Sequence, residues 1–185
     1  SSSTNVVKCL QIIEAFQVRR LFCSISSAGY HTLFREMWSD CNSDPQKLYE
    51  KLTTSTGYEW PDDIMFSNWV RNASLYSKSK FCRYILNEFE LSENRQNSDV
   101  LSRFSVSTSE HIVPQDISGT EWASIITSDE HEELVHTWGN LTILTAWENP
   151  EVGRKPWSEK RTHYLEEGIY KSPKKVAREY PEVFD

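Results

Sequence analysis

The sequence predicts an α+β protein in which an N-terminal helical bundle is packed on a smaller C-terminal unit that contains two strands. Through the first hundred residues, apolar side chains recur at helical spacing, and prolines stand where helices can begin. Further along, two short segments alternate in the manner of strands. The last thirty residues return to helical spacing and contain well-placed helix breakers.

The first half predicts four helices. Three of them span residues 4–22, 44–52 and 61–72, and the fourth begins near Ser79 and carries Phe81 to Phe89. Residues 92–103 are polar and rich in Asn and Ser, which is typical of a linker. We therefore expect a helical bundle over 1–100 and a second unit over 101–185, packed as one compact domain. The missing initial methionine suggests a fragment of a longer protein.

The second half predicts the order strand, loop, strand, helix. The run FSVSTSEHIVPQ alternates from Phe104 and stops at Pro114, and GNLTILTAW over 139–147 predicts the second strand. Between them, residues 120–136 predict a polar loop and a short acidic helix capped by Ser128. A helix then begins at Pro156 and ends at Gly168, and a last one starts at 172–173 and ends before Pro181.

Composition excludes several classes of protein. The chain has 185 residues, of which 38% are hydrophobic, and its seven tryptophans are incompatible with a disordered chain. It has no apolar stretch of about 18 residues, as a membrane span would need, and SSSTN is no signal peptide. The four cysteines are widely spaced, so we expect reduced core thiols, a cytoplasmic location and no cysteine-ligated zinc.

Charge is unevenly distributed along the chain, whose net charge is −7. Residues 105–149 carry eight acidic residues and no Lys or Arg, whereas 150–178 carry eight basic residues against four acidic ones, a net of +4. Residues 71–83 add four basic residues and no acidic one. This pattern suits a cation site flanked by phosphate contacts, and ordinary solvated faces would explain the charges alone equally well.

Three polar residues stand where the expected elements meet: His111 in EHIVPQ, Asn140 in HTWGNLTIL, and Asn149 nine residues later. EHIVPQ is close to the DHIVPQ of the HNH domain in the RNA-guided CRISPR nuclease. Residues 105–165 resemble still more closely the C-terminal HNH domain of GmrSD-type modification-dependent restriction enzymes. The resemblance rests on EHIVPQ, Trp122, His136, the GNLTIL strand, Asn149, the KPW run over 155–157 and the EK pair over 159–160. One departure is Arg154, where many members of that family have Asn.

The resemblance implies a ββα-metal (HNH, His-Me finger) unit that cleaves DNA with a divalent cation, by nicking or by double-strand cleavage. His111, Asn140 and Asn149 would form the catalytic set. A neutral imidazole such as His111 suits the removal of a proton from water at neutral pH. Glu110 and Asn149 offer oxygen ligands for Mg²⁺, or Mn²⁺ in its place. Asn140 would pin the loop or orient His111, and His136 would support it from the second layer.

The resemblance also implies partners. The substrate would be foreign or phage DNA, possibly modified, with contacts to its backbone from Arg154, Lys155, Lys160 and Arg161. The full-length protein would carry an N-terminal domain that uses a nucleotide, and no part would enter a membrane.

Two other interpretations stay open. The chain could be an HNH-like module that binds DNA without cleaving it, or a metal hydrolase with another substrate. Glu110 also has an alternative as a structural acid, because neighbouring residues of a strand point to opposite faces. Only a bend at the strand end would bring Glu110 and His111 into one site.

Overall fold

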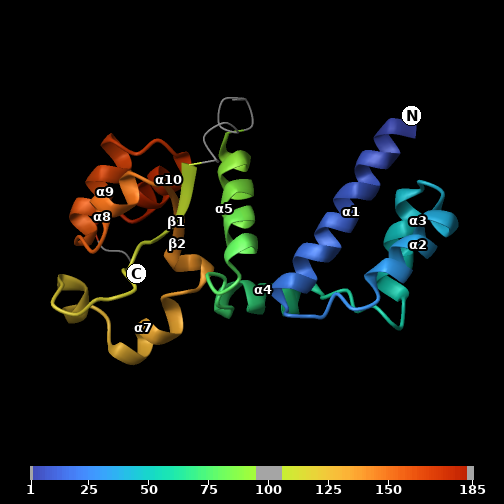
Figure 1. Ribbon diagram of the computed structural model, residues 1–185, viewed down its shortest axis with the longest axis horizontal. Coiled ribbons are helices and arrows are strands. Elements are labelled where there is room, and N and C mark those ends of the chain that lie inside the picture. Colours follow the sequence, from blue (N-terminus) through green and yellow to red (C-terminus); the bar gives the residue numbers. More distant parts are fainter. Residues whose placement is uncertain (1, 95–105, 183–185) are drawn as a thin grey trace. The chain divides into compact units, whose positions relative to one another are not determined.

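A computed structural model describes residues 2–94 and 106–182 of the chain, apart from the side chains at positions 2 and 38. Within these ranges the protein is α+β, mostly helical with a small two-stranded antiparallel sheet, which confirms the expected fold class (Figure 1). Residues 95–103 of the expected linker, and Phe104 at the start of the expected first strand, lie outside the described residues.

The chain divides into two compact units, Ser1–Val70 and Arg71–Asp185. The division lies earlier than the expected one near residue 100, because the helix α5 (Ser79–Glu93) packs against the sheet and against the last helix. The helical spacing of α5 was visible in the sequence, but its packing partners lie in the second half of the chain. Each unit is described by itself below.

The first unit consists of helices α1 (Ser2–Phe22), α2 (Tyr30–Cys41), α3 (Pro45–Thr54) and most of α4 (Asp63–Asn72). Its core is formed by residues from α1, α2 and α3, among them Phe16, Leu33 and Leu52. Asp44 caps α3 by accepting hydrogen bonds from the two backbone amides at positions 46 and 47. The helix α2 was not predicted, since it follows a left-handed Gly29 and lacks a side-chain cap.

The second unit continues after α5 with β1 (Ser107–His111), α7 (Ser128–Leu134), β2 (Leu141–Thr145), α8 (Glu148–Val152), α9 (Trp157–Glu166) and α10 (Lys171–Glu179). Strand β1 pairs antiparallel with β2, so that Ser107 lies opposite Thr145 and His111 opposite Leu141. Two short 3₁₀ turns, Glu121–Ser124 and Trp138–Asn140, precede α7 and β2. The turn at 138–140 occupies the beginning of the segment that was expected to be strand.

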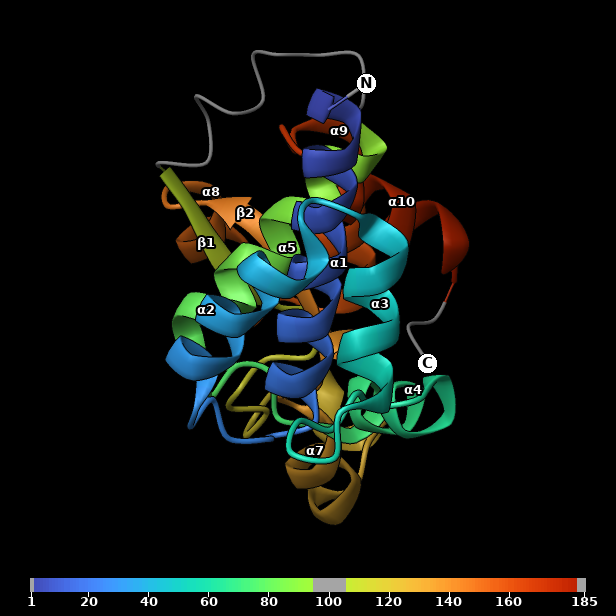
Figure 2. The same ribbon diagram turned by 90° about the vertical axis from the view of Figure 1, so that its right-hand side faces the viewer.

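The hairpin of β1 and β2 lies between α5 on one side and α8 to α10 on the other (Figure 1). All five residues of β2 are buried, because the strand is covered on both faces. The surrounding core includes Ile112, Trp122, Leu144, Trp157 and Tyr164. In both ribbon views α7 lies at the opposite end of this unit from α9 (Figures 1 and 2).

The ends of the helices follow local chemistry. Thr127, one residue before the expected Ser128, caps α7 in a capping box with Glu130. Gly168 ends α9 as expected, and its amide donates a hydrogen bond to the carbonyl of His163. A Cβ at Gly168 would lie 2.7 Å from the Tyr164 carbonyl oxygen, so the backbone there excludes any other residue without a shift. The last helix ends before Pro181, as predicted.

The four cysteines are buried and none of them is in a disulfide, as the sequence predicts. Over the part of the chain that the structure describes, no helix combines the length and the apolar character that a membrane crossing would require.

Candidate active site

His111 is the last residue of β1, and its ring is enclosed by two other rings. Its Nε2 lies 3.1 Å from Nδ1 of His136, and the residue is only 6% exposed. Tyr76 packs edge-on against His111, with ring centroids 4.4 Å apart, and stacks on His136. Tyr76 is itself anchored, because its amide donates a hydrogen bond to the His136 carbonyl at 3.2 Å. Three segments of the second unit therefore fix the orientation of one imidazole.

The environment of His111 keeps its ring neutral. Burial is the main cause that lowers the pKa of His111 to about 4, and His136 and Lys160 lower it further. A neutral His111 that donates from Nε2 to His136 carries its lone pair on Nδ1. Nδ1 has no hydrogen-bond partner among the described residues. It is also not among their side-chain atoms that are both fully buried and without a hydrogen-bond partner. It is therefore the nitrogen that reaches solvent.

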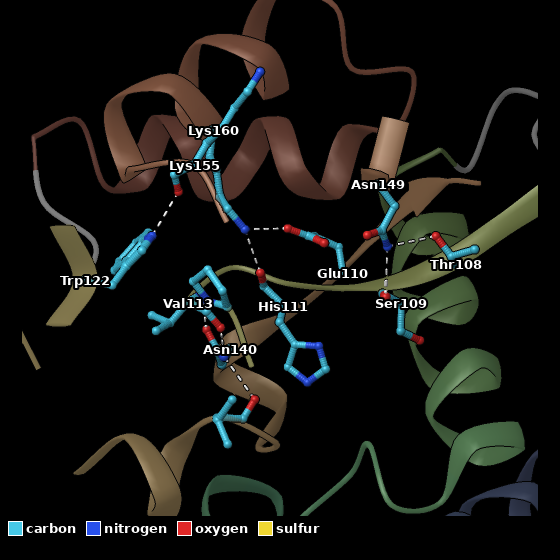
Figure 3. Close-up of polar contacts among 12 residues, drawn as sticks. Thr108, Ser109, Glu110, His111, Val113, Trp122, Asn140, Asn149, Lys155 and Lys160 are labelled. Atoms are coloured by element: carbon cyan, nitrogen blue, oxygen red, sulfur yellow. Dashed lines mark hydrogen bonds and ion pairs between the residues drawn. The ribbon is translucent and has the colours of Figure 1, made fainter. Parts of the chain in front are cut away.

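Asn140 holds the chain that follows His111. Its Oδ1 accepts a hydrogen bond from the Val113 amide at 2.7 Å, and its Nδ2 donates to the carbonyls of Val113 and Val135, both at 2.9 Å (Figure 3). Its own carbonyl accepts from the Ile112 amide. The buried side chain thus joins the end of β1 to the segment after α7. Asn140 positions the loop and does not itself point its polar atoms at solvent.

Glu110 lies on the opposite side of β1 from the His111 ring (Figure 3). Its Oε1 accepts a hydrogen bond from Lys160 Nζ at 2.6 Å, and the two side chains are 5% and 0% exposed. The same ammonium donates to the His111 carbonyl at 2.8 Å. Burial raises the pKa of Glu110 against the opposing effect of Lys160, and burial lowers the pKa of Lys160.

This pair bears on two expectations from the sequence. The Glu110 side chain lies on the other face of β1 from the His111 ring, because the strand is regular there. Its carboxylate is neutralised by an ammonium rather than presented to a cation. Lys160 has no exposed surface with which to contact a DNA phosphate. The EK pair of the motif therefore supplies an internal ion pair.

Asn149, in α8, is half-buried beside β1. Its Nδ2 donates to Thr108 Oγ1 at 3.0 Å and to the Ser109 carbonyl at 3.1 Å (Figure 3). Both hydrogen bonds use the amide nitrogen, so the side chain is fixed and its Oδ1 is not engaged by a described residue. An amide oxygen held in this way is a suitable ligand for a hard cation.

Glu148 is a buried residue of the site region that the sequence analysis missed. Its Oε2 accepts from the Thr145 amide and hydroxyl, its backbone amide donates to that hydroxyl, and its Oε1 accepts from the Ile169 amide at 3.1 Å. These bonds set the direction in which α8 leaves β2. The spacing Thr-x-x-Glu is that of a capping box, and this signal could have identified it.

The remaining expected DNA contacts differ in exposure. Lys155 is exposed, and its carbonyl accepts a hydrogen bond from the Trp122 indole. Arg154 forms an ion pair with Asp116 at 3.1 Å and also donates to the Ser118 carbonyl. Arg161 is half-buried and donates from Nε to the Ala177 carbonyl at 2.9 Å. Of the three, Lys155 is exposed and has no side-chain bond to a protein group among the described residues.

The elements that carry His111, Asn140 and Asn149 all fall within residues 60–180, which match the family model described as GmrSD restriction endonucleases, C-terminal domain. The match covers well over half of the chain. The chain belongs to this family. No curated protein and no solved structure matches it. Membership in the GmrSD C-terminal domain family indicates a nuclease role related to restriction, with DNA as the substrate.

Proposed function

We propose that this GmrSD C-terminal domain is a metal-dependent DNA endonuclease of the HNH type, with His111 as the general base. In this proposal β1, β2 and α8 form the ββα-metal unit. The observation that carries it is the state of His111, whose ring is neutral, lies against His136 at Nε2 and has no hydrogen-bond partner at Nδ1 among the described residues. A structural histidine buried in a core would normally have both nitrogens satisfied.

The reaction follows from this geometry. Nδ1 of His111 accepts a proton from a water molecule as the water oxygen forms a bond to the phosphorus of the DNA backbone. The bond between phosphorus and the leaving 3′ oxygen then breaks, and the leaving oxygen takes up a proton from solvent. With the tautomer in which His111 Nε2 donates to His136, Nδ1 is left unprotonated, while Asn140 fixes the segment next to the ring.

Of the two expected ligands, Asn149 suits the expected cation, Mg²⁺ or Mn²⁺, better than Glu110 does. The free Oδ1 of Asn149 suits a hard cation, whereas a cation at Glu110 would have to displace the ammonium of Lys160. We therefore propose Asn149 as the ligand from this pair and Glu110 as a positioning residue. When bound, such a cation supplies charge stabilisation at the phosphate and the leaving oxygen.

DNA binding in this proposal depends on the exposed Lys155, assisted by Arg154 and Arg161, which already bond to protein groups. Such contacts read the phosphate backbone and not the sequence. We also propose that the chain acts in the cytoplasm against foreign or phage DNA, within a larger protein that carries a nucleotide-using N-terminal domain.

Plasmid nicking tests the proposal directly. The wild-type chain should nick supercoiled DNA with Mg²⁺ or Mn²⁺ and stop when EDTA is added. His111→Ala should lower the rate by about 10²–10⁴, the usual effect of losing a general base. His31→Ala, which removes an exposed histidine of α2, is the matched control and should nick like the wild type. Residual nicking by His111→Ala within threefold of the wild type would refute His111 as the base, and DNA binding without any nicking would favour the inactive module.

A further inference from the structure

A second histidine, His163 of α9, lies buried among carboxylates at the junction of α8 and α9. It is 8% exposed, and its Nδ1 lies 3.3 Å from Glu167 Oε2, one helical turn further on. On the other side of the ring, Nε2 lies 3.9 Å from Glu148 Oε1, too far for a hydrogen bond. This buried Nε2 has no hydrogen-bond partner among the residues that the structure describes.

Glu151 of α8 completes the group. Ligand atoms of Glu151, His163 and Glu167 all lie within 4.8 Å of one another, and both glutamates are exposed. The two carboxylates repel each other at this spacing unless a positive charge lies close to both. Lys155 lines the same open hollow of about 580 Å³, but the described residues include no ion pair between Lys155 and either carboxylate.

The tautomer of His163 explains how a cation would fit. If Nε2 carries the hydrogen, its N–H points toward the buried Glu148 carboxylate, and the lone pair of Nδ1 points toward Glu167. Metal-bound histidines are usually oriented in this way, with the second ring nitrogen directed at a carboxylate behind it. Glu148 is itself fixed by the Thr145 and Ile169 amides, so the orienting group is rigid.

This group is separate from the residues assigned to DNA cleavage. Asn149 and Glu151 are two positions apart in α8, which places their side chains roughly 200° apart around the helix axis. Asn149 faces β1, through its bonds to Thr108 and Ser109, whereas Glu151 faces the end of α9.

We propose that Glu151, His163 and Glu167 bind a divalent first-row transition-metal ion such as Zn²⁺. A nitrogen ligand combined with carboxylates favours such an ion over Mg²⁺, which prefers oxygen ligands alone. The Glu148 carboxylate lies behind the imidazole, water completes the coordination, and the ion fastens α8, which carries Asn149, to the end of α9.

Calorimetric titration of the full chain with Zn²⁺, in an excess of Mg²⁺ that occupies purely oxygen-ligated sites, tests the proposal. We expect one ion per chain in the wild type and at least tenfold weaker binding in Glu151→Gln and in Glu167→Gln. Both replaced side chains are exposed, so these variants should fold. Glu166→Gln, an exposed glutamate of the same helix, makes the same change of charge and should bind like the wild type.

Thermal unfolding gives a second measurement that does not depend on cleavage. Zn²⁺ should raise the Tm of the wild type and of Glu166→Gln, but not that of Glu167→Gln. Asn149→Ala and His111→Ala should keep the Zn²⁺ effect, which separates this site from the proposed nuclease site. No binding by the wild type at about a hundred times the protein concentration, or equal weakening by Glu166→Gln, would overturn the proposal.

Discussion

Lys160→Met removes the ammonium that neutralises the buried carboxylate of Glu110. The two groups lie 2.6 Å apart, and neither side chain is more than 5% exposed. Without Lys160, the carboxylate must either stay charged in the core or take up a proton, and its pKa is already raised by burial. Removing one partner of a buried ion pair lowers the free energy of unfolding by about 3–5 kcal/mol. That is a large part of the roughly 5–15 kcal/mol available to a domain, and corresponds to a fall in Tm of roughly 10–20 °C.

A double-mutant cycle isolates the pair from the loss of packing. Urea unfolding followed by tryptophan fluorescence would compare Lys160→Met, Glu110→Leu and the double variant. The double variant should recover most of the loss, because an apolar pair replaces the ion pair, apart from the donor that the His111 carbonyl loses. Lys155→Met, an exposed lysine nearby, should change stability by less than about 0.5 kcal/mol. A loss below about 1 kcal/mol in Lys160→Met would refute the buried pair, and a double variant whose loss equals the sum of the two single losses would show that the two groups are not coupled.

Three further predictions concern the rest of the site. Because the pKa of His111 is lowered to about 4, the rate of cleavage should stay nearly constant down to pH 5. The stability that the neutral ring contributes above about pH 6.5 should be lost as the pH falls through 4. A fall in rate centred near pH 6.5 would contradict this. Asn140→Ala should lower the free energy of unfolding by about 2–4 kcal/mol, since it leaves buried backbone groups of Val113 and Val135 unpaired, and urea unfolding that shows no change would refute that role. The double variant Arg154→Glu, Lys155→Glu should reduce the slope of log affinity for DNA against log salt concentration. The reduction should be about one for each phosphate that the protein no longer neutralises. The control Lys8→Glu, which replaces an exposed lysine of α1, should leave the slope unchanged.

The fold was predictable from the sequence where the apolar periodicity was strong or where capping and helix-breaking residues marked the ends of helices. Pro45 after the capping Asp44, and Gly168 after α9, mark helix ends that the structure confirms. The five-residue helix α8 is too short to show a period and contains Pro150, so a turn was the natural expectation there. The position of α5 in the second unit depends on packing across the chain, which periodicity does not encode.

The candidate site was predictable in its residues but not in its pairings. The motif singled out His111, Asn140 and Asn149, and the structure gives each of them specific hydrogen bonds. The motif could not show that Lys160, fifty positions away, forms a hydrogen bond with Glu110, because that contact requires α9 to lie over the end of β1. The contact between His111 and His136 likewise depends on the loop that Asn140 closes.

The two faces of β1 explain why the Glu110 carboxylate lies apart from the neighbouring His111 ring. Lys160 donates both to the Glu110 carboxylate and to the His111 carbonyl, so one ammonium fixes the side chain of one residue and the backbone of the next. The Asn140 carbonyl, at the end of the 3₁₀ turn before β2, accepts a hydrogen bond from the following amide, that of Ile112. The backbone next to the His111 ring is therefore fixed by hydrogen bonds on both sides. The ring itself contacts His136 and Tyr76, and its Nδ1 has no hydrogen-bond partner among the described residues. Under the proposed function, a change at Glu110 should therefore act on the position of His111, and so on the rate at saturating metal, rather than on the concentration of metal needed for half-maximal cleavage.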